Sequence, residues 1–211
     1  MSRNPVSYIK NRVKRYLLKK EIDAVRRRKR PLNIIIGAAD TKYKGWISTD
    51  LPVFDALNKA DWSMMFSKGS INRILAEHVI DYWKKEEFHY FLKTASYFLS
   101  EAAYIRIAVP DMFNPQPDYI SYITSGVDLN GLPDRKEVFY DYIRITDILS
   151  VEKYDFRLLE YFDEEGNFNS YMWKEEDGFV RRSFRYDSRN KIIPFSYTSL
   201  IVDAWPKKYR I

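Results

Sequence analysis

The chain has 211 residues, of which 35 are Lys or Arg and 29 are Asp or Glu, giving a formal charge of +6 at pH 7. This length suits one domain of ordinary size, and a content of 45% apolar and 30% charged residues is typical of a globular protein. The absence of cysteine excludes disulfides, cysteine-ligated zinc, iron–sulfur clusters and cysteine nucleophiles. With two histidines, His78 and His89, we expect no bound metal. Without a long apolar run or an apolar leader, we expect no transmembrane helix and a cytoplasmic protein.

The positive charge is concentrated at the start of the chain. Residues 1–30 carry a net charge of +10, whereas the remaining residues carry −4. Apolar residues recur there at helical spacing among the basic ones: Val6, Ile9, Val13, Tyr16, Leu17 and Val25. We therefore predict a basic amphipathic helix within residues 1–30 that ends before Pro31. Such a helix either packs its apolar stripe on the rest of the protein or contacts an acidic partner, another polyanion or the inner membrane surface.

After Pro31 the pattern is that of a single α/β domain over residues 31–211. Apolar, β-branched runs predict strands at 32–36, 46–51, 71–76, 104–109, 156–162 and 197–205. Helical spacing predicts helices at 84–100 and 144–153, whereas the proline- and glycine-bearing residues 110–134 are expected to form a loop. The polar, turn-rich residues 163–196 are expected to form a hairpin insertion.

The alternation of strands and helices predicts a mostly parallel sheet with helices on both faces. The last two predicted strands have no clear helix between them, and a strand pair without a crossover helix is most simply antiparallel. We therefore expect the final strand to run antiparallel to its neighbours.

The turn after the first predicted strand is a candidate ligand site. That strand ends in Gly37, Ala38, Ala39 and Asp40, and small residues at this place let a ligand approach the backbone closely. Asp50 ends the second predicted strand, where an acid in dinucleotide-type sheets accepts hydrogen bonds from ribose hydroxyls. An ordinary tight turn with a capping acid explains the same residues.

With these stretches in view, the chain resembles the class I S-adenosylmethionine-dependent methyltransferases. More narrowly, it is similar to a bacterial family of predicted methyltransferases that is linked with surface polysaccharide genes. The similarity covers roughly residues 30–206 and is carried by the stretches LNIIIGAADTKYKGWISTDLPVFD, ADWSMMFSKGSINRILAEHVIDYW, IRIAVPD and DGFVRRSFRYDSRN. It implies a Rossmann-like, seven-stranded sheet with an antiparallel last strand, and S-adenosylmethionine as cofactor.

The resemblance also assigns cofactor-binding roles to individual residues. It places Gly37, Ala38 and Ala39 beside the methionine part of the cofactor, Asp50 at the ribose, Leu51 against the adenine, Asp61 and Trp62 at the adenine edge, and Glu77 facing the cofactor. The chain departs from the family pattern at Ala39, which replaces a glycine, and at Asp81-Tyr82, which replaces a second Glu-His pair. These departures favour an alternative in which the fold persists without activity and serves as a binding or scaffold module.

Two residues are candidates for the catalytic base, and three arginines for the acceptor site. His78 and Asp111 stand where a base can take the acceptor's proton, although a strand-end histidine bonded to a carboxylate is the alternative for His78. Arg181, Arg182 and Arg189 suit a carboxylate or phosphate, or else brace the hairpin through salt bridges with nearby acids such as Glu175, Glu176 and Asp177.

The predicted function is methyl transfer to a small-molecule or glycan acceptor in surface polysaccharide biosynthesis. A nucleic-acid substrate bound through the basic helix ranks below this. The Asp/Asn-Pro-Pro-Tyr signature of base-amino methyltransferases is absent, and Val109-Pro110-Asp111 is a poor substitute.

Overall fold

The computed structural model describes residues 5–128, 131–192, 195 and 197–207. Residues 1–4 of the predicted N-terminal helix lie outside this part, as do 193, 194 and 196 of the predicted hairpin insertion. The helices, including the 3-10 helices η1 to η3, are α1 (Pro5–Arg27), α2 (Lys59–Met65), η1 (Ile80–Tyr82), α3 (Lys85–Phe98), α4 (Pro117–Thr124), α5 (Tyr142–Val151), η2 (Glu175–Asp177) and η3 (Ser188–Lys191). The strands are β1 (Asn33–Ile36), β2 (Trp46–Ser48), β3 (Ile71–Glu77), β4 (Leu99–Pro110), β5 (Tyr154–Phe162), β6 (Phe168–Ser170) and β7 (Ser199–Pro206).

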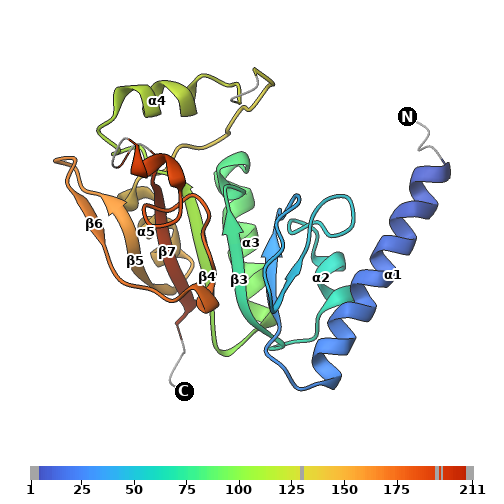
Figure 1. Cartoon of the computed structure of the whole chain (residues 1–211). Helices are drawn as coiled ribbons and strands as arrows, with labels where there is room; N and C mark the ends of the chain where they lie inside the picture. The colour runs from blue at the N-terminus through green and yellow to red at the C-terminus, as the bar shows by residue number, and fades with distance from the viewer. Residues whose placement is uncertain (1–4, 129–130, 193–194, 196, 208–211) are drawn as a thin grey trace.

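All seven strands form one sheet in the order β2-β1-β3-β4-β7-β5-β6 (Figure 1). Strands β2, β1, β3 and β4 are parallel, and β7 lies antiparallel between β4 and β5. Strand β6 forms an antiparallel hairpin with β5 at the edge. The predicted Rossmann-like sheet with an antiparallel last strand is confirmed.

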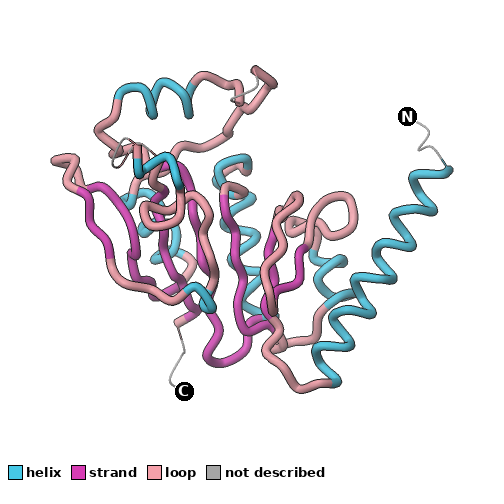
Figure 2. Tube along the Cα trace, viewed as in Figure 1, coloured by secondary structure: helices cyan, strands magenta, loops and turns pink. Residues whose placement is uncertain are grey.

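The two faces of the sheet are covered in different ways because successive strand residues point to opposite sides. Ile34 and Ile36 belong to a large apolar core that also takes buried residues from α1, α2, α3 and α5. Ile35 belongs to a smaller core on the other face, which is covered by residues from the segment 171–192 (Figure 2). Helices α1, α2, α3 and α5 thus cover one face, the segment 171–192 covers the other, and α4 contributes no residue to either core.

The prediction of a loop over residues 110–134 was wrong in part, because this segment contains helix α4. Proline opens this helix at Pro117, and proline is favoured in the first turn, where no N–H partner is needed. Tyr119 and Ile123, one turn apart, are its buried residues. Helix α2 was also missed, since seven residues give too few turns for a periodic signal, and the Asn58 side chain caps it by accepting from Ala60 N–H.

A buried ion pair joins the central strands on the face that lacks α-helices. The β4–β7 register sets Arg106 opposite Asp203, and the guanidinium donates two hydrogen bonds of 2.7 Å to the carboxylate. Arg106 is 1% exposed, also donates to the Gly178 carbonyl at 2.6 Å, and lies 4.7 Å from the Trp173 ring centroid. The pair therefore attaches the segment 171–192 to the middle of the sheet.

Replacing Arg106 by methionine should strongly destabilise the protein. The substitution leaves the largely buried Asp203 carboxylate without its partner, a change that typically costs about 3–5 kcal/mol of the free energy of unfolding. Urea denaturation followed by circular dichroism measures the loss. The control is K44M at an exposed position, which should stay within about 0.5 kcal/mol of wild type. Equal stability of R106M and K44M would contradict a stabilising role of the Arg106–Asp203 pair.

Candidate functional site

Asp50 lies at the carboxyl end of β2, in contact with the turn that follows β1. Its carboxylate accepts hydrogen bonds of 2.7 Å from the N–H groups of Ala39 and Leu51. The turn has left-handed backbone at Gly37 (φ 61°) and at Ala39 (φ 46°), which brings the Ala39 N–H to Asp50. An ionised carboxylate has about four acceptor sites, so the half-buried Asp50 keeps about two for a ligand.

An open groove of about 380 Å³ lies beside Asp50. Ala39, Asp50 and Leu51 line it from the sheet side, and Lys14 and Leu17 of α1 line it from the other. Leu51 is 67% exposed and offers an apolar surface next to the carboxylate. The structure therefore brings three of the predicted cofactor-binding residues, Ala39, Asp50 and Leu51, together in one groove.

The carboxyl ends of β1 and β3 are closed by the protein's own side chains. A Cβ added at Gly37 would lie 2.5 Å from Val79 Cγ2, so glycine is needed there for packing. Ala38 is buried on the same turn, and its N–H donates to the Thr49 carbonyl. The Glu77 carboxylate accepts from the backbone N–H groups of Arg181 (3.2 Å) and Arg182 (2.7 Å), while burial raises its pKa.

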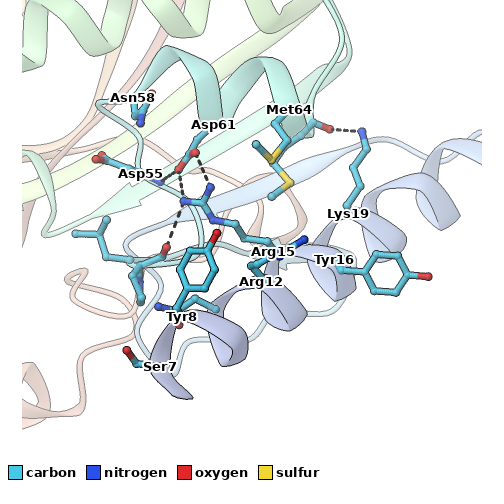
Figure 3. Close-up of a pocket in the computed structure, with 14 residues that line it drawn as sticks. Ser7, Tyr8, Arg12, Arg15, Tyr16, Lys19, Asp55, Asn58, Asp61 and Met64 are labelled. Atoms are coloured by element: carbon cyan, nitrogen blue, oxygen red, sulfur yellow. Dashed lines mark hydrogen bonds and ion pairs between the residues drawn. The ribbon is translucent and has the colours of Figure 1, made fainter. Parts of the chain in front are cut away.

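Asp61 and Trp62 of α2, which were predicted to contact the adenine edge, do not line the Asp50 groove. Their polar groups bond to other parts of the protein instead. Asp61 is 3% exposed and forms an ion pair with Arg15 of α1 at 3.0 Å, as Figure 3 shows. It also accepts from the Asp55 N–H at 2.9 Å. Trp62 is fully buried and donates to the Ala56 carbonyl at 2.9 Å. Asp61 lines a second groove of about 890 Å³ between α1 and the residues of 51–65.

His78 stands just past the end of β3 with left-handed backbone (φ 53°). Its Nε2 lies 3.0 Å from the Ser199 hydroxyl, and its buried Nδ1 has no hydrogen-bond partner among the described residues. Burial lowers the pKa of His78 well below 6.5, and the positive charges of Arg182, Lys136 and Arg189 lower it further. The imidazole is therefore neutral at pH 7 and keeps an acceptor nitrogen.

A small cavity of about 60 Å³ lies against His78 and is rich in cations. Lys136, Arg182 and Arg189 line it together with the tyrosines Tyr119, Tyr122 and Tyr197. Lys136 donates to Asp134 at 3.1 Å, and Arg189 forms an ion pair with Asp187 at 2.6 Å and lies 3.6 Å from the Tyr197 ring centroid.

Arg182 is the cation of this cavity that is left for a ligand. Its guanidinium forms no ion pair within 4 Å in the described part of the chain, whereas Arg189 pairs with Asp187. Arg181 is exposed and contributes its backbone N–H to Glu77. Asp177 does not neutralise the tail arginines, because it forms an ion pair of 2.6 Å with Arg73 of β3. An unpaired guanidinium beside a neutral histidine suits a carboxylate or phosphate.

Asp111 joins two strands and does not line the His78 cavity. It follows β4, is fully buried, and accepts from the N–H groups of Phe113 (3.0 Å) and Phe162 (2.8 Å). Burial raises the pKa of Asp111 to about 7, against the lowering effect of these two hydrogen bonds. Its contacts are those of a structural carboxyl that holds the end of β5 beside the end of β4.

Ser199 and Lys136 also line the His78 cavity, and neither was predicted from the sequence. The predicted antiparallel last strand gave a signal for Ser199, because the start of such a strand meets the carboxyl end of its parallel neighbour. Lys136 had no comparable signal, since it comes from an irregular segment that only the tertiary fold brings to His78.

Comparisons with known proteins identify the fold. No family model matches the chain, and no curated protein matches it. A chain of the solved complex between the Trm112 methyltransferase activator and a methyltransferase of Haloferax volcanii is similar at TM-score 0.51 and 8% identity, over 86% of this chain and 84% of that one. The chain shares its fold with that structure. Two further solved structures match with lower TM-scores.

Both are S-adenosylmethionine-dependent methyltransferases. The one from Thermotoga maritima is 12% identical over 95% of this chain and 97% of that one, with a TM-score of 0.48. The one from Archaeoglobus fulgidus is 12% identical over 95% and 98%, with a TM-score of 0.45.

The stability of the protein should depend on pH through Asp111. Its folded pKa of about 7 exceeds the ordinary value of about 3.9, so the native state holds its proton more firmly. The corresponding stability is present below about pH 4 and is lost as the pH rises through about 7. Between pH 4 and 8 the free energy of unfolding of wild type should fall more than that of D111N, by up to about 4 kcal/mol.

Urea denaturation at a series of pH values measures this difference. The exposed variant D40N is the control and should follow the wild-type curve, because Asp40 lies in solvent. Parallel curves for wild type and D111N would show that the pKa of Asp111 is the same in the folded and unfolded protein, which contradicts the prediction.

Proposed function

We propose that the protein is an S-adenosylmethionine-dependent methyltransferase that acts on a small-molecule acceptor carrying a carboxylate or phosphate. The observation that supports it most is the Asp50 carboxylate, which two backbone N–H groups orient at the edge of an open groove. Ligands of parallel α/β sheets bind at this edge, beyond the carboxyl ends of the strands.

The residues at the end of β2 fit the nucleoside half of the cofactor. Asp50 has acceptor sites for two ribose hydroxyls, Leu51 offers an apolar surface for the adenine, and Ala39 fixes the carboxylate through its N–H. Asp61 does not fit the adenine role, because Arg15 and the Asp55 N–H engage its carboxylate. When bound, the cofactor supplies an electrophilic methyl group to the acceptor.

The protein's own part in the reaction is to hold the acceptor and take its proton. Arg182, which lines the His78 cavity, holds the acceptor's anionic group, and the neutral imidazole of His78 is the base. Ser199 bonds Nε2 and fixes the ring, which leaves Nδ1 as the nitrogen without a protein partner. Arg189 also lines the cavity, Arg181 holds Glu77 through its backbone N–H, and Asp111 supports the end of β4.

The finer assignments from the sequence remain predictions. A glycan acceptor in surface polysaccharide biosynthesis rests on the family resemblance, and the cationic cavity adds only that the acceptor is acidic. In the described part of the chain, no helix has the length and apolar character needed to span a membrane. The cytoplasmic location is likewise a prediction.

Calorimetry with S-adenosylmethionine and S-adenosylhomocysteine tests the cofactor. Wild type should bind both, and D50N should bind about tenfold to a hundredfold more weakly, since a hydrogen bond to a charged group contributes about 1.5–3 kcal/mol. D40N removes the same charge from the neighbouring turn and should bind like wild type. The proposal fails if wild type binds neither compound at millimolar concentration.

A second function, that of a binding module without catalysis, is favoured by the closed ends of β1 and β3. Val79 occupies the space beside Gly37, and backbone N–H groups occupy Glu77. The variant V79A separates the two functions. Cofactor binding by V79A but not by wild type would show that Val79 closes the site in the native chain.

The state of His78 can be measured directly, because the chain has one other histidine. In proton NMR the imidazole of His78 should titrate well below pH 6.5, with H89Q assigning the two signals. At pH 7, millimolar inorganic phosphate should shift the His78 signal in wild type and in K44M, but not in R182M. A His78 signal that titrates at or above 6.5, or that ignores phosphate, would contradict the acceptor site.

A further inference from the structure

Helix α1 carries two apolar stripes, and only one of them packs on the protein. Leu18 and Ile22 are buried in the main core, and Val25 packs against it. A second set is exposed to solvent: Ile9 (62%), Val13 (52%), Tyr16 (58%) and Leu17 (56%). Its members are spaced i, i+4, i+7 and i+8, so they share one face of the helix, turned away from Leu18 and Ile22.

The sequence pattern had placed these residues in a single stripe with Val25. The side chain of Val6 lies outside the part that the structure describes. The prediction that the stripe packs on the rest of the protein is correct for Val25. It is wrong for Ile9, Val13, Tyr16 and Leu17, because more than half of each side chain is exposed to solvent.

Exposed cations flank the exposed stripe. Lys10, Lys14 and Lys20 are exposed and have no acid within 4 Å among the described residues, and Lys20 lies 4.7 Å from the Tyr16 ring centroid. The exposed run Arg27-Arg28-Lys29-Arg30 follows at the end of the helix. An apolar stripe with tyrosine, bordered by cations, is the pattern of a helix that lies in a membrane surface.

The inner side of α1 is fixed to the rest of the protein. Arg15 pairs with Asp61, Lys19 donates to the Met65 carbonyl at 3.1 Å, and Arg26 donates to the Ser70 hydroxyl at 3.1 Å. Figure 1 shows α1 at one end of the molecule, beside α2 and far from α5. These contacts hold α1 at an edge of the fold, with the outer stripe facing solvent.

We propose that α1 docks the protein on an anionic lipid membrane, with the stripe Ile9, Val13, Tyr16 and Leu17 in the headgroup region and the lysines on anionic headgroups. The positive charge favours a lipid membrane over a second copy of the chain. Pairing two copies through α1 would bring together two segments that each carry a net charge of +10. A nucleic acid would engage the lysines and leave the apolar stripe in water. Lys14 and Leu17 also line the groove beside Asp50, but the proposal does not depend on methyl transfer.

Vesicle sedimentation with the full chain tests this surface. The protein should bind vesicles of phosphatidylcholine and phosphatidylglycerol at least tenfold more strongly than vesicles of phosphatidylcholine alone, and added salt should weaken the binding. The variant I9S/V13S/L17S and the variant K10Q/K14Q/K20Q should each lose most of it. The matched control V151S/M172S/I192S changes three exposed apolar residues elsewhere and should bind like wild type.

Thermal unfolding of each variant verifies that it is folded. Equal binding to the two kinds of vesicle, or wild-type binding by I9S/V13S/L17S, would overturn the proposal. Light scattering after gel filtration adds a further check. A wild-type dimer that fails to bind vesicles and that I9S/V13S/L17S converts to a monomer would assign the stripe to a second copy of the chain.

Discussion

The Arg106–Asp203 pair is the interaction on which the face of the sheet without α-helices depends. A buried guanidinium has to satisfy its donors, and here two go to Asp203 and one to the Gly178 carbonyl. The pair binds β4 to β7 and draws the segment 171–192 across the sheet. That segment then reaches the end of β3, where the Arg181 and Arg182 N–H groups bond Glu77. The cationic side of the candidate acceptor site follows from this arrangement.

Carboxylates at the edge of the sheet divide between holding the fold and remaining open to a ligand. Asp61, Glu77 and Asp111 are engaged by Arg15 or by backbone N–H groups, and burial raises the pKa of Glu77 and Asp111. Asp50 is bonded as well, but it is half exposed and keeps acceptor sites toward a groove. Asp50 therefore differs from Asp61 and Asp111 in its exposure, since all three carboxylates accept hydrogen bonds from backbone N–H groups.

Much of the fold could be predicted from local patterns. The run at 32–36 and the runs before Pro110 and at 197–205 are apolar and β-branched because their strands are central in the sheet, and this signal is strong. Helices α2 and α4 were not predicted because they are short. The helix-start signals of Asn58 and Pro117 were weaker than the turn signals of the residues around them. The site was predicted less well. Asp50 and His78 were placed at the correct edge of the sheet, but they line different cavities, and Lys136 reaches His78 through an irregular segment.

The sequence by itself determined the order of the strands along the chain, the antiparallel last strand, the basic helix at the start and the absence of cysteine chemistry. These follow from composition and from periods of two and 3.6 residues, which are local properties. Only the tertiary structure decided which apolar residues of α1 are buried, which guanidinium of the His78 cavity forms no ion pair, and which strand-end carboxylates still face solvent. Each of these depends on partners from distant parts of the chain, such as Arg15 with Asp61 or Glu77 with Arg182, and no local period carries that information.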